Sequence, residues 1–214
     1  MDRYEIIQGA VGAETLKLVK DSLVISKDAA YHLEGVPFED TKRFGDPQCP
    51  DSFVSYGHPV CEALLLSLGP RLERVTGKSL LPTYSYGRIY WKGAILEKHK
   101  ARESCQYSAT LCVDAAPDPW PIFMDGNELI LEPGDMVCYK GMEVEHWREP
   151  YRGQQQIQVF LHFVDKNGIY ADRLYDGRPC LGFDRTMPPA KAREWAQAAL
   201  ALQEQARVGC RKPD

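Results

Sequence analysis

The chain has 214 residues, of which 44% are hydrophobic and 26% are charged, and its formal net charge is −4. This length is sufficient for one compact domain with a sizeable core, but the sequence shows no basic excess that would neutralise nucleic-acid phosphates and no apolar run near the roughly 20 residues of a membrane span. The N-terminus contains acidic residues and no long apolar core, so we expect a cytoplasmic protein that binds neither nucleic acid nor membrane.

Two amphipathic helices are predicted in the first third of the chain. Residues 13–25 place leucines and valines on one face at helical spacing, and residues 59–75 carry a second leucine stripe. Gly77 is the expected left-handed cap of the second helix. Residues 27–57 are polar and rich in turn formers, which predicts a long loop that borders a site.

From Leu80 the hydrophobic period changes from helical to two, which indicates strands. We expect about seven or eight short strands over residues 80–166, including a hairpin that turns at Asp125 and Gly126. This pattern predicts a β-sandwich or barrel-like double sheet with the helices packed outside it. A third amphipathic helix is predicted over residues 190–207.

The seven cysteines argue against a zinc site and for buried thiols. Their number is odd and no two form a CxxC pair, which disfavours a zinc ribbon. Cys105, Cys112 and Cys138 lie in apolar strand-like segments and are expected to be buried and reduced.

Two histidines stand out within the strand-rich region, His99 and His146. Neutral imidazole is a frequent ligand of divalent metals, and two histidines with one carboxylate suit a non-haem Fe(II) that keeps open coordination positions. Side chains at positions i and i+2 of a strand share a face, so residue 101 is expected to face the same cavity as His99. That residue is Ala101, which cannot bind a metal.

The ordered runs R-I-Y-x-K-G-x-x-L-x-x-H-x-x-R-x-S-C, EPGDMVxYxGxExEHWRE and QVFLHFVD resemble the Fe(II)/2-oxoglutarate-dependent dioxygenases, specifically their small prolyl-hydroxylase-like and phytanoyl-hydroxylase-like bacterial members. The resemblance covers about residues 80–166, with weaker similarity in the flanking helices. It implies a mainly β fold with flanking helices, a double-stranded β-helix (jelly-roll, cupin-like) core, and iron at the open end of that core. The whole chain, 1–214, would form a single domain of this type.

The family has His-x-Asp or His-x-Glu where this chain has His99-Lys100-Ala101. A subset of the superfamily, the radical halogenases, has alanine or glycine at this position, and chloride or bromide binds the iron there. The resemblance therefore implies a halogenase that uses Fe(II), 2-oxoglutarate, O2 and halide. An iron(IV)-oxo species would abstract hydrogen from an aliphatic carbon, and the carbon radical would recombine with the halide.

The distal carboxylate of 2-oxoglutarate should pair with arginine, because a guanidinium binds a carboxylate in a bidentate manner. Many family members have a basic residue after the second histidine, where this chain has Gln154, Gln155 and Gln156. Arg148 is the first choice, since it lies two residues from His146 and shares its inward face. The full set of candidates for this pocket is Arg88, Tyr90, Thr110, Arg148 and Arg152.

Ala101 is also compatible with a natural or engineered alteration in a hydroxylase, or with a non-catalytic jelly-roll that binds a ligand. Glu103 lies on the same side of a strand as Ala101 and is a possible substitute ligand. His162 is expected to be a structural, hydrogen-bonded histidine.

The substrate is expected to be a small molecule, either a free metabolite or one tethered to a carrier protein. Residues 36–56 and 166–189 are the predicted lids, because both segments are polar and rich in turn formers.

Overall fold

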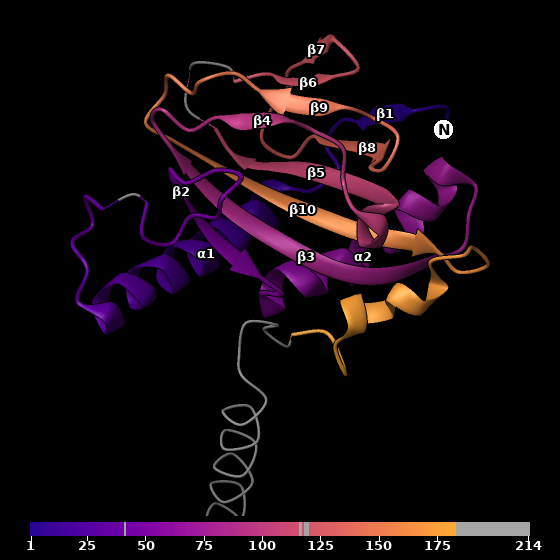
Figure 1. Cartoon of the computed structure of the whole chain (residues 1–214), viewed down its shortest axis with the longest axis horizontal. Helices are drawn as coiled ribbons and strands as arrows, with labels where there is room; N and C mark the ends of the chain where they lie inside the picture. The colour runs from indigo at the N-terminus through magenta and orange to yellow at the C-terminus, as the bar shows by residue number, and fades with distance from the viewer. Residues whose placement is uncertain (41, 116, 118–119, 183–214) are drawn as a thin grey trace, which may run out of the picture. The chain divides into compact units, whose positions relative to one another are not determined.

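A six-stranded antiparallel sheet forms the larger layer of the fold (Figure 1). In spatial order its strands are β1 (Tyr4–Ile7), β8 (Met136–Lys140), β5 (Tyr107–Asp114), β10 (Gln155–Asp165), β3 (Leu80–Trp91) and β2 (Ser52–Tyr56). The second, four-stranded sheet contains β4 (Leu96–His99), β9 (His146–Arg148), β6 (Ile122–Met124) and β7 (Asn127–Leu129). The predicted double sheet is confirmed, and the period-two alternation placed most of its strands.

The computed structural model describes residues 1–40, 42–115, 117 and 120–182. The helix predicted over residues 190–207 lies outside this part of the chain. Residues Met1–Phe183 form one compact unit, and the single domain over 1–214 stays a prediction.

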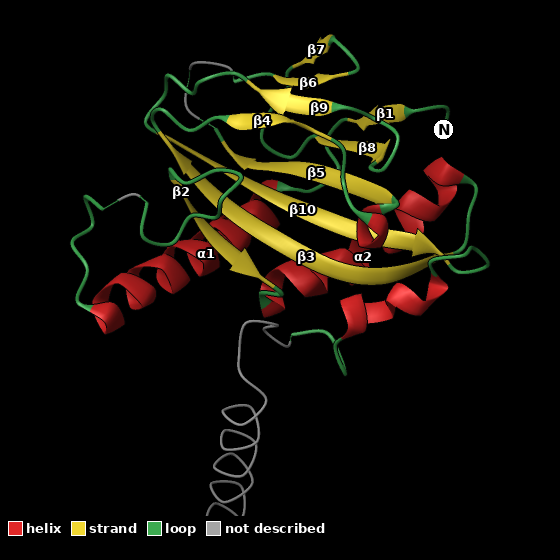
Figure 2. Cartoon of the chain, viewed as in Figure 1, coloured by secondary structure: helices red, strands yellow, loops and turns green. Residues whose placement is uncertain are grey.

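Two long helices, α1 (Ala13–Glu34) and α2 (Pro59–Thr76), cover one face of the larger sheet (Figure 2). Short 3-10 turns, η1 (Glu103–Cys105) and η2 (Ala171–Gly177), follow β4 and β10. Helix α2 ends at a left-handed Gly77, with φ of 68°, as predicted.

Helix α1 extends beyond residue 25, where the sequence predicted that it would end. Tyr31 continues the buried face on the last turns, and Gly35, with φ of 64°, ends the helix in a left-handed conformation. The exposed polar residues of this extension resemble a loop in the sequence. The strand β2 was likewise predicted as loop, because it is a short edge strand that pairs only with β3.

The side chains of the central strand β10 alternate between two environments, one on each face of the larger sheet. Ile157, Val159 and Leu161 are fully buried in the hydrophobic core that includes residues of α1 and α2. Phe160 and His162, at alternate positions of the strand, line a cavity. Since successive side chains of a strand point to opposite faces, the cavity lies on the side of the sheet away from the helices.

The hairpin between β6 and β7 turns at Asp125 and Gly126, as predicted, and both residues have positive φ, 48° and 84°. Two positive φ values define the tight turn that matches the twist of paired strands. No helix within the described residues is both long enough and apolar enough to cross a membrane.

Candidate metal and co-substrate site

His99 and His146 face each other on neighbouring strands. Strand β4 ends at His99 and β9 begins at His146, and antiparallel pairing places the two residues in register. Their ring centroids are 4.2 Å apart, and the ring planes are tilted by 51°. The structure thus brings together the two imidazoles that the sequence singled out.

Backbone carbonyls fix the tautomer of both rings. Nδ1 of His99 donates to the carbonyl of Glu97 at 2.7 Å. Nδ1 of His146 donates to the carbonyl of Val144 at 3.0 Å. A carbonyl oxygen only accepts hydrogen bonds, so each ring carries its proton on Nδ1 and keeps a lone pair on Nε2. Metal-binding histidines are held in this way, with the second nitrogen donating to a fixed acceptor.

Burial favours the neutral form of both rings. Burial lowers the pKa of His99 below its ordinary value. Burial, together with repulsion from His99, lowers the pKa of His146 to about 4. A neutral imidazole is the form that binds a metal ion.

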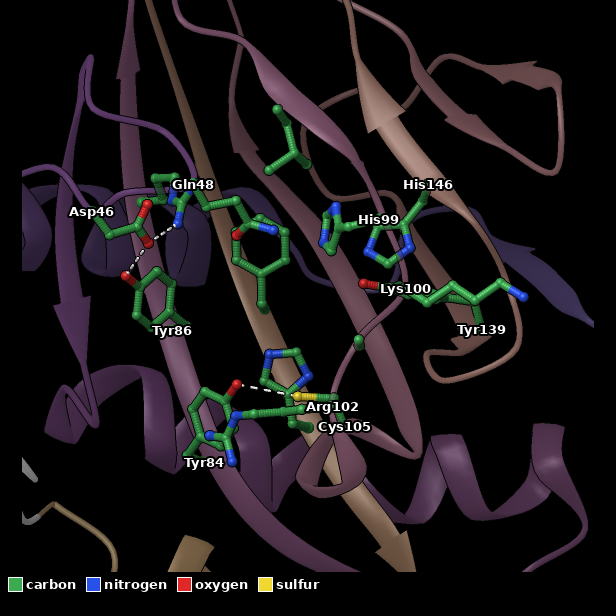
Figure 3. Close-up of a pocket in the computed structure, with 15 residues that line it drawn as sticks. Asp46, Gln48, Tyr84, Tyr86, His99, Lys100, Arg102, Cys105, Tyr139 and His146 are labelled. Carbon is green, nitrogen blue, oxygen red and sulfur yellow. Dashed lines mark hydrogen bonds and ion pairs between the residues drawn. The ribbon is translucent and has the colours of Figure 1, made fainter.

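A cavity of about 320 Å³ opens beside the paired histidines (Figure 3). His99 and His146 lie toward one end of it, and Tyr84, Arg102 and Cys105 lie toward the other. This volume is at the lower end of the range for small-molecule sites, roughly 300–1,000 Å³. The cavity therefore fits small ligands rather than a large partner.

Ala101 lines the same cavity, and its amide donates to the carbonyl of Gly141 at 2.9 Å. Glu103, the possible substitute ligand, is exposed on the η1 turn and forms an ion pair with Arg173 at 2.6 Å. Within the described ranges, no group of three or more histidine, cysteine, aspartate or glutamate side chains is arranged to hold a metal ion. The structure gives no support to Glu103 as a third ligand. The metal-binding side chains at this end of the cavity are the two imidazoles of His99 and His146.

Buried polar atoms without partners gather between the two sheets. Among the described residues, the buried atoms that lack a hydrogen-bond partner include Nε and Nη1 of Arg88, the hydroxyl of Tyr90, Nε of Arg148 and both amide atoms of Gln158. Gln158 is in register with Arg88, whose guanidinium lies 5.5 Å from the centre of the Tyr90 ring. Since buried polar groups are normally paired, this cluster fits a polar ligand.

Arg148 is the more deeply buried of the two arginines, with 1% of its surface exposed against 3% for Arg88. Its Nη1 donates to the carbonyl of Trp120 at 2.5 Å, and no ion pair with an acidic side chain is formed among the described residues. Burial lowers the pKa of this guanidinium. A buried cation is normally paired, so Arg148 is a strong candidate to bind an anion.

The other predicted pocket residues differ in position. Thr110 is fully buried, and its hydroxyl lies 3.5 Å from that of Tyr139, whose ring is 4.9 Å from the ring of His146. Arg152 does not line this cavity; it lines a separate groove together with Trp120. Arg152 was a candidate only because it lies close to His146 in the sequence.

Asp46 is a cavity residue that the sequence analysis did not single out. It lies in the loop between α1 and β2, and its carboxylate accepts hydrogen bonds from Arg88 and, at 2.7 Å, from the hydroxyl of Tyr86. The prediction that this loop borders a site is consistent with its position. No spacing rule points to one acidic residue within a polar loop, so only the fold could reveal Asp46.

No family model and no curated protein matches this chain. Solved structures do match. A prolyl-4-hydroxylase from Pseudomonas putida is 19% identical with a TM-score of 0.55, and the match covers 76% of this chain and 92% of that one. HygX from Streptomyces hygroscopicus, with nickel and 2-oxoglutarate bound, is 13% identical with a TM-score of 0.55, covering 77% and 83%.

A third match is an oxidoreductase of the 2OG-Fe(II) oxygenase family from Burkholderia pseudomallei, 14% identical with a TM-score of 0.54, covering 77% of this chain and 85% of that one. At these identities the likeness shows the fold alone. The described chain therefore has the double-stranded β-helix fold of such oxygenases, mainly β with flanking helices, as predicted.

Proposed function

We propose that this protein is an Fe(II)- and 2-oxoglutarate-dependent oxidoreductase, and more specifically a halogenase that replaces an aliphatic C–H hydrogen with chloride or bromide. The observation that carries the proposal is the pair of neutral imidazoles with free Nε2 lone pairs beside Ala101. The substrate would be a small molecule, either free or tethered to a carrier.

His99 and His146 fit an iron site because their orientation and protonation state are fixed before any metal arrives. Two protein nitrogens on one side of the ion leave several coordination positions for exogenous ligands. When bound, iron and 2-oxoglutarate would supply the oxidative chemistry on the C–H bond, and the protein would supply position and environment.

Arg88, Tyr90 and Arg148 fit the distal carboxylate of 2-oxoglutarate, with Thr110 nearby. Arg88 lines the cavity and its guanidinium lies 5.5 Å from the centre of the Tyr90 ring, whereas Tyr90, Thr110 and Arg148 lie behind the residues that line it. Charge-assisted hydrogen bonds in a buried site are stronger than neutral ones, which favours a dianionic co-substrate. Arg152 is omitted from this set, because it lines the other groove.

Ala101 distinguishes halogenation from hydroxylation in this proposal. Its methyl group occupies the wall position where a carboxylate would otherwise reach the metal, so a halide from solution can bind there. HygX carries nickel and 2-oxoglutarate on the same fold, which supports the cofactor assignment and leaves the halide to experiment.

The test is spectroscopic and needs no substrate. The protein is loaded anaerobically with Fe(II), 2-oxoglutarate and bromide, and X-ray absorption at the iron edge is recorded. We expect scattering from one bromide bound to iron in the wild-type protein. In an Ala101→Asp variant we expect the bromide signal to disappear while iron and 2-oxoglutarate remain bound.

The possible outcomes separate the alternatives. Iron and 2-oxoglutarate bound without bromide in the wild-type protein would favour an altered hydroxylase, for which Ala101→Asp should increase hydroxylated product. Failure to bind either Fe(II) or 2-oxoglutarate would favour a non-catalytic binding protein. Succinate formation tied to oxygen uptake would rule out that last alternative.

A further inference from the structure

A third imidazole, that of His162, faces the same cavity from the central strand β10. Only 7% of the residue is exposed, and its ring centroid lies 4.5 Å from that of Tyr84. Its single hydrogen bond with the described residues is formed between Nδ1 and the hydroxyl of Ser108 at 2.9 Å. This contact matches the predicted structural role, but it uses only one of the two ring nitrogens.

The hydrogen-bond network sets the tautomer of His162. The hydroxyl of Ser108 donates its proton to the carbonyl of Cys105 at 3.1 Å. A hydroxyl has one proton, so Ser108 accepts from the ring, and Nδ1 of His162 is the donor. Nε2 therefore carries a lone pair, and none of the described residues donates to it.

Metal binding does not account for this lone pair. The described histidines, cysteines and acidic residues form no cluster of three that could hold an ion, so His162 is not grouped with His99 and His146. A side chain that is nine-tenths buried, oriented by its neighbours and provided with a free acceptor is suited to a ligand that donates a hydrogen bond.

The surroundings of His162 indicate the chemistry of that ligand. The ring of Tyr84 forms an aromatic wall, and the guanidinium of Arg102 lies 4.8 Å from the centre of that ring. The charge of Arg102 is compensated, since its two terminal nitrogens each bond to a carboxylate oxygen of Asp176 at 2.7 Å. This end of the cavity offers an acceptor, an apolar face and a neutralised ion pair.

We propose that His162 is a substrate-recognition residue whose Nε2 accepts a hydrogen bond from an O–H or N–H group of the substrate, so that the substrate class is a small, uncharged alcohol or amide held against Tyr84. The inference rests on the proposed function for its meaning as substrate recognition. The contact orients the substrate within a cavity whose other end carries the paired histidines.

The test uses the full chain labelled with [15N]histidine, and the wild-type protein is titrated with two matched lactams. 2-Pyrrolidinone has an N–H donor, and N-methyl-2-pyrrolidinone has the same ring without it. We expect long-range 15N spectra to show an unprotonated Nε2 on His162. We also expect 2-pyrrolidinone to shift that resonance and to bind about tenfold more tightly than its methylated analogue, since one hydrogen bond separates them.

His162→Phe keeps an aromatic ring against Tyr84 and removes the acceptor, so it should bind the two lactams equally. His32→Gln, on the exposed side of α1, is the control and should retain the tenfold difference. Equal binding by the wild-type protein, a proton on Nε2, or no shift with either lactam would each overturn the inference. These spectra need neither Fe(II) nor 2-oxoglutarate, so failure of the proposed function would be seen separately in the bromide experiment.

Discussion

A buried guanidinium without an anionic partner is costly, and Arg148 forms no ion pair with any acidic side chain that the structure describes. The fold tolerates that cost at a place where a carboxylate of the proposed co-substrate would compensate it. Arg148 should therefore be more important for binding than for stability.

We predict that Arg148→Met weakens 2-oxoglutarate binding on the order of ten- to a hundredfold, the range expected for loss of a charged hydrogen bond. The free energy of unfolding should not fall, because the variant removes a buried charge that has no ion-pair partner in the described part of the chain. Anaerobic calorimetry with Fe(II) and 2-oxoglutarate measures the affinity. Arg152→Met, on the separate groove, is the matched control and should bind normally; equal losses in both variants would contradict the assignment.

The protonation of His162 has a consequence for acid stability. Burial lowers its pKa in the folded protein to about 3, whereas an unfolded histidine has a pKa of about 6.5. Between these values the unfolded chain binds a proton that the folded chain does not, so acid destabilises the fold in this interval.

We predict that the unfolding free energy of the wild-type protein falls as pH decreases from about 6.5, and that His162→Phe loses about 1.4 kcal/mol less per pH unit. Urea unfolding at several pH values provides the measurement. Other histidines with lowered pKa contribute equally to both proteins and cancel in the comparison. Parallel curves for the two proteins would show that His162 is not held neutral.

At the scale of elements, the connection after β8 supports the segment that carries Ala101. A Cβ atom at Gly141 would lie 2.2 Å from the carbonyl oxygen of Cys105 and 3.2 Å from the Cβ of Ala101. The first of these neighbours is backbone and cannot turn away. Glycine is required here for close packing of two loops at the cavity wall.

We therefore predict that Gly141→Ala destabilises the protein by about 1–3 kcal/mol, as expected for overpacking, and weakens Fe(II) binding by displacing the Ala101 segment. Gly12→Ala is the control, since a Cβ there meets no atom within 4 Å. Chemical unfolding and metal titration of both variants give the answer. Normal iron affinity in Gly141→Ala would show that the two loops move independently.

The sequence predicted helices and strands correctly where the hydrophobic periodicity was strong. It missed segments whose side chains are mostly exposed, because these show no clear periodicity. The alternation of β3, β5 and β10 and the leucines of α2 were sufficient to place those elements. The last turns of α1 and the edge strand β2 were missed, because most of their side chains are polar or only partly buried. The same limit applies to the candidate site: residue type indicated His99 and His146, and the i, i+2 spacing of a strand indicated Ala101, whereas Asp46 comes from a loop.

At the scale of the whole molecule, a buried ion pair ties the segment after β10 to α2. Arg178 donates to Glu62 at 2.6 Å, and both side chains are only 3% exposed. The same arginine donates to the carbonyl of Thr83 on β3 at 3.0 Å. The segment that ends the described chain is thus fixed to a helix and a strand far away in sequence.

We predict that Glu62→Ala lowers the unfolding free energy on the order of 3–5 kcal/mol, because it removes one side of a buried, charged hydrogen bond between Glu62 and Arg178. Replacing both partners, Glu62→Met with Arg178→Met, should restore much of the loss, since neither charge remains buried. Thermal and urea unfolding compare the three proteins. A double variant no more stable than Glu62→Ala would mean that the pair contributes through specific geometry rather than through charge compensation.

The sequence could indicate the jelly-roll class, but it could not indicate which polar side chains would lack hydrogen-bond partners among the described residues. Arg88, Tyr90 and Gln158 come from two strands separated by the whole middle of the chain, and Arg148 comes from the opposite sheet. Their convergence depends on strand order, which the local pattern does not encode.

Because side chains alternate between the two faces of β10, neighbouring residues of this strand meet different structural constraints. Changes at Ile157, Val159 or Leu161 would disturb packing against the helices, whereas changes at Phe160 or His162 would alter the wall of the cavity. Under the proposed function, substrate preference would change through the second set, and the packing of the first set would be preserved. A single-residue insertion between them would exchange the two sets and abolish both properties together.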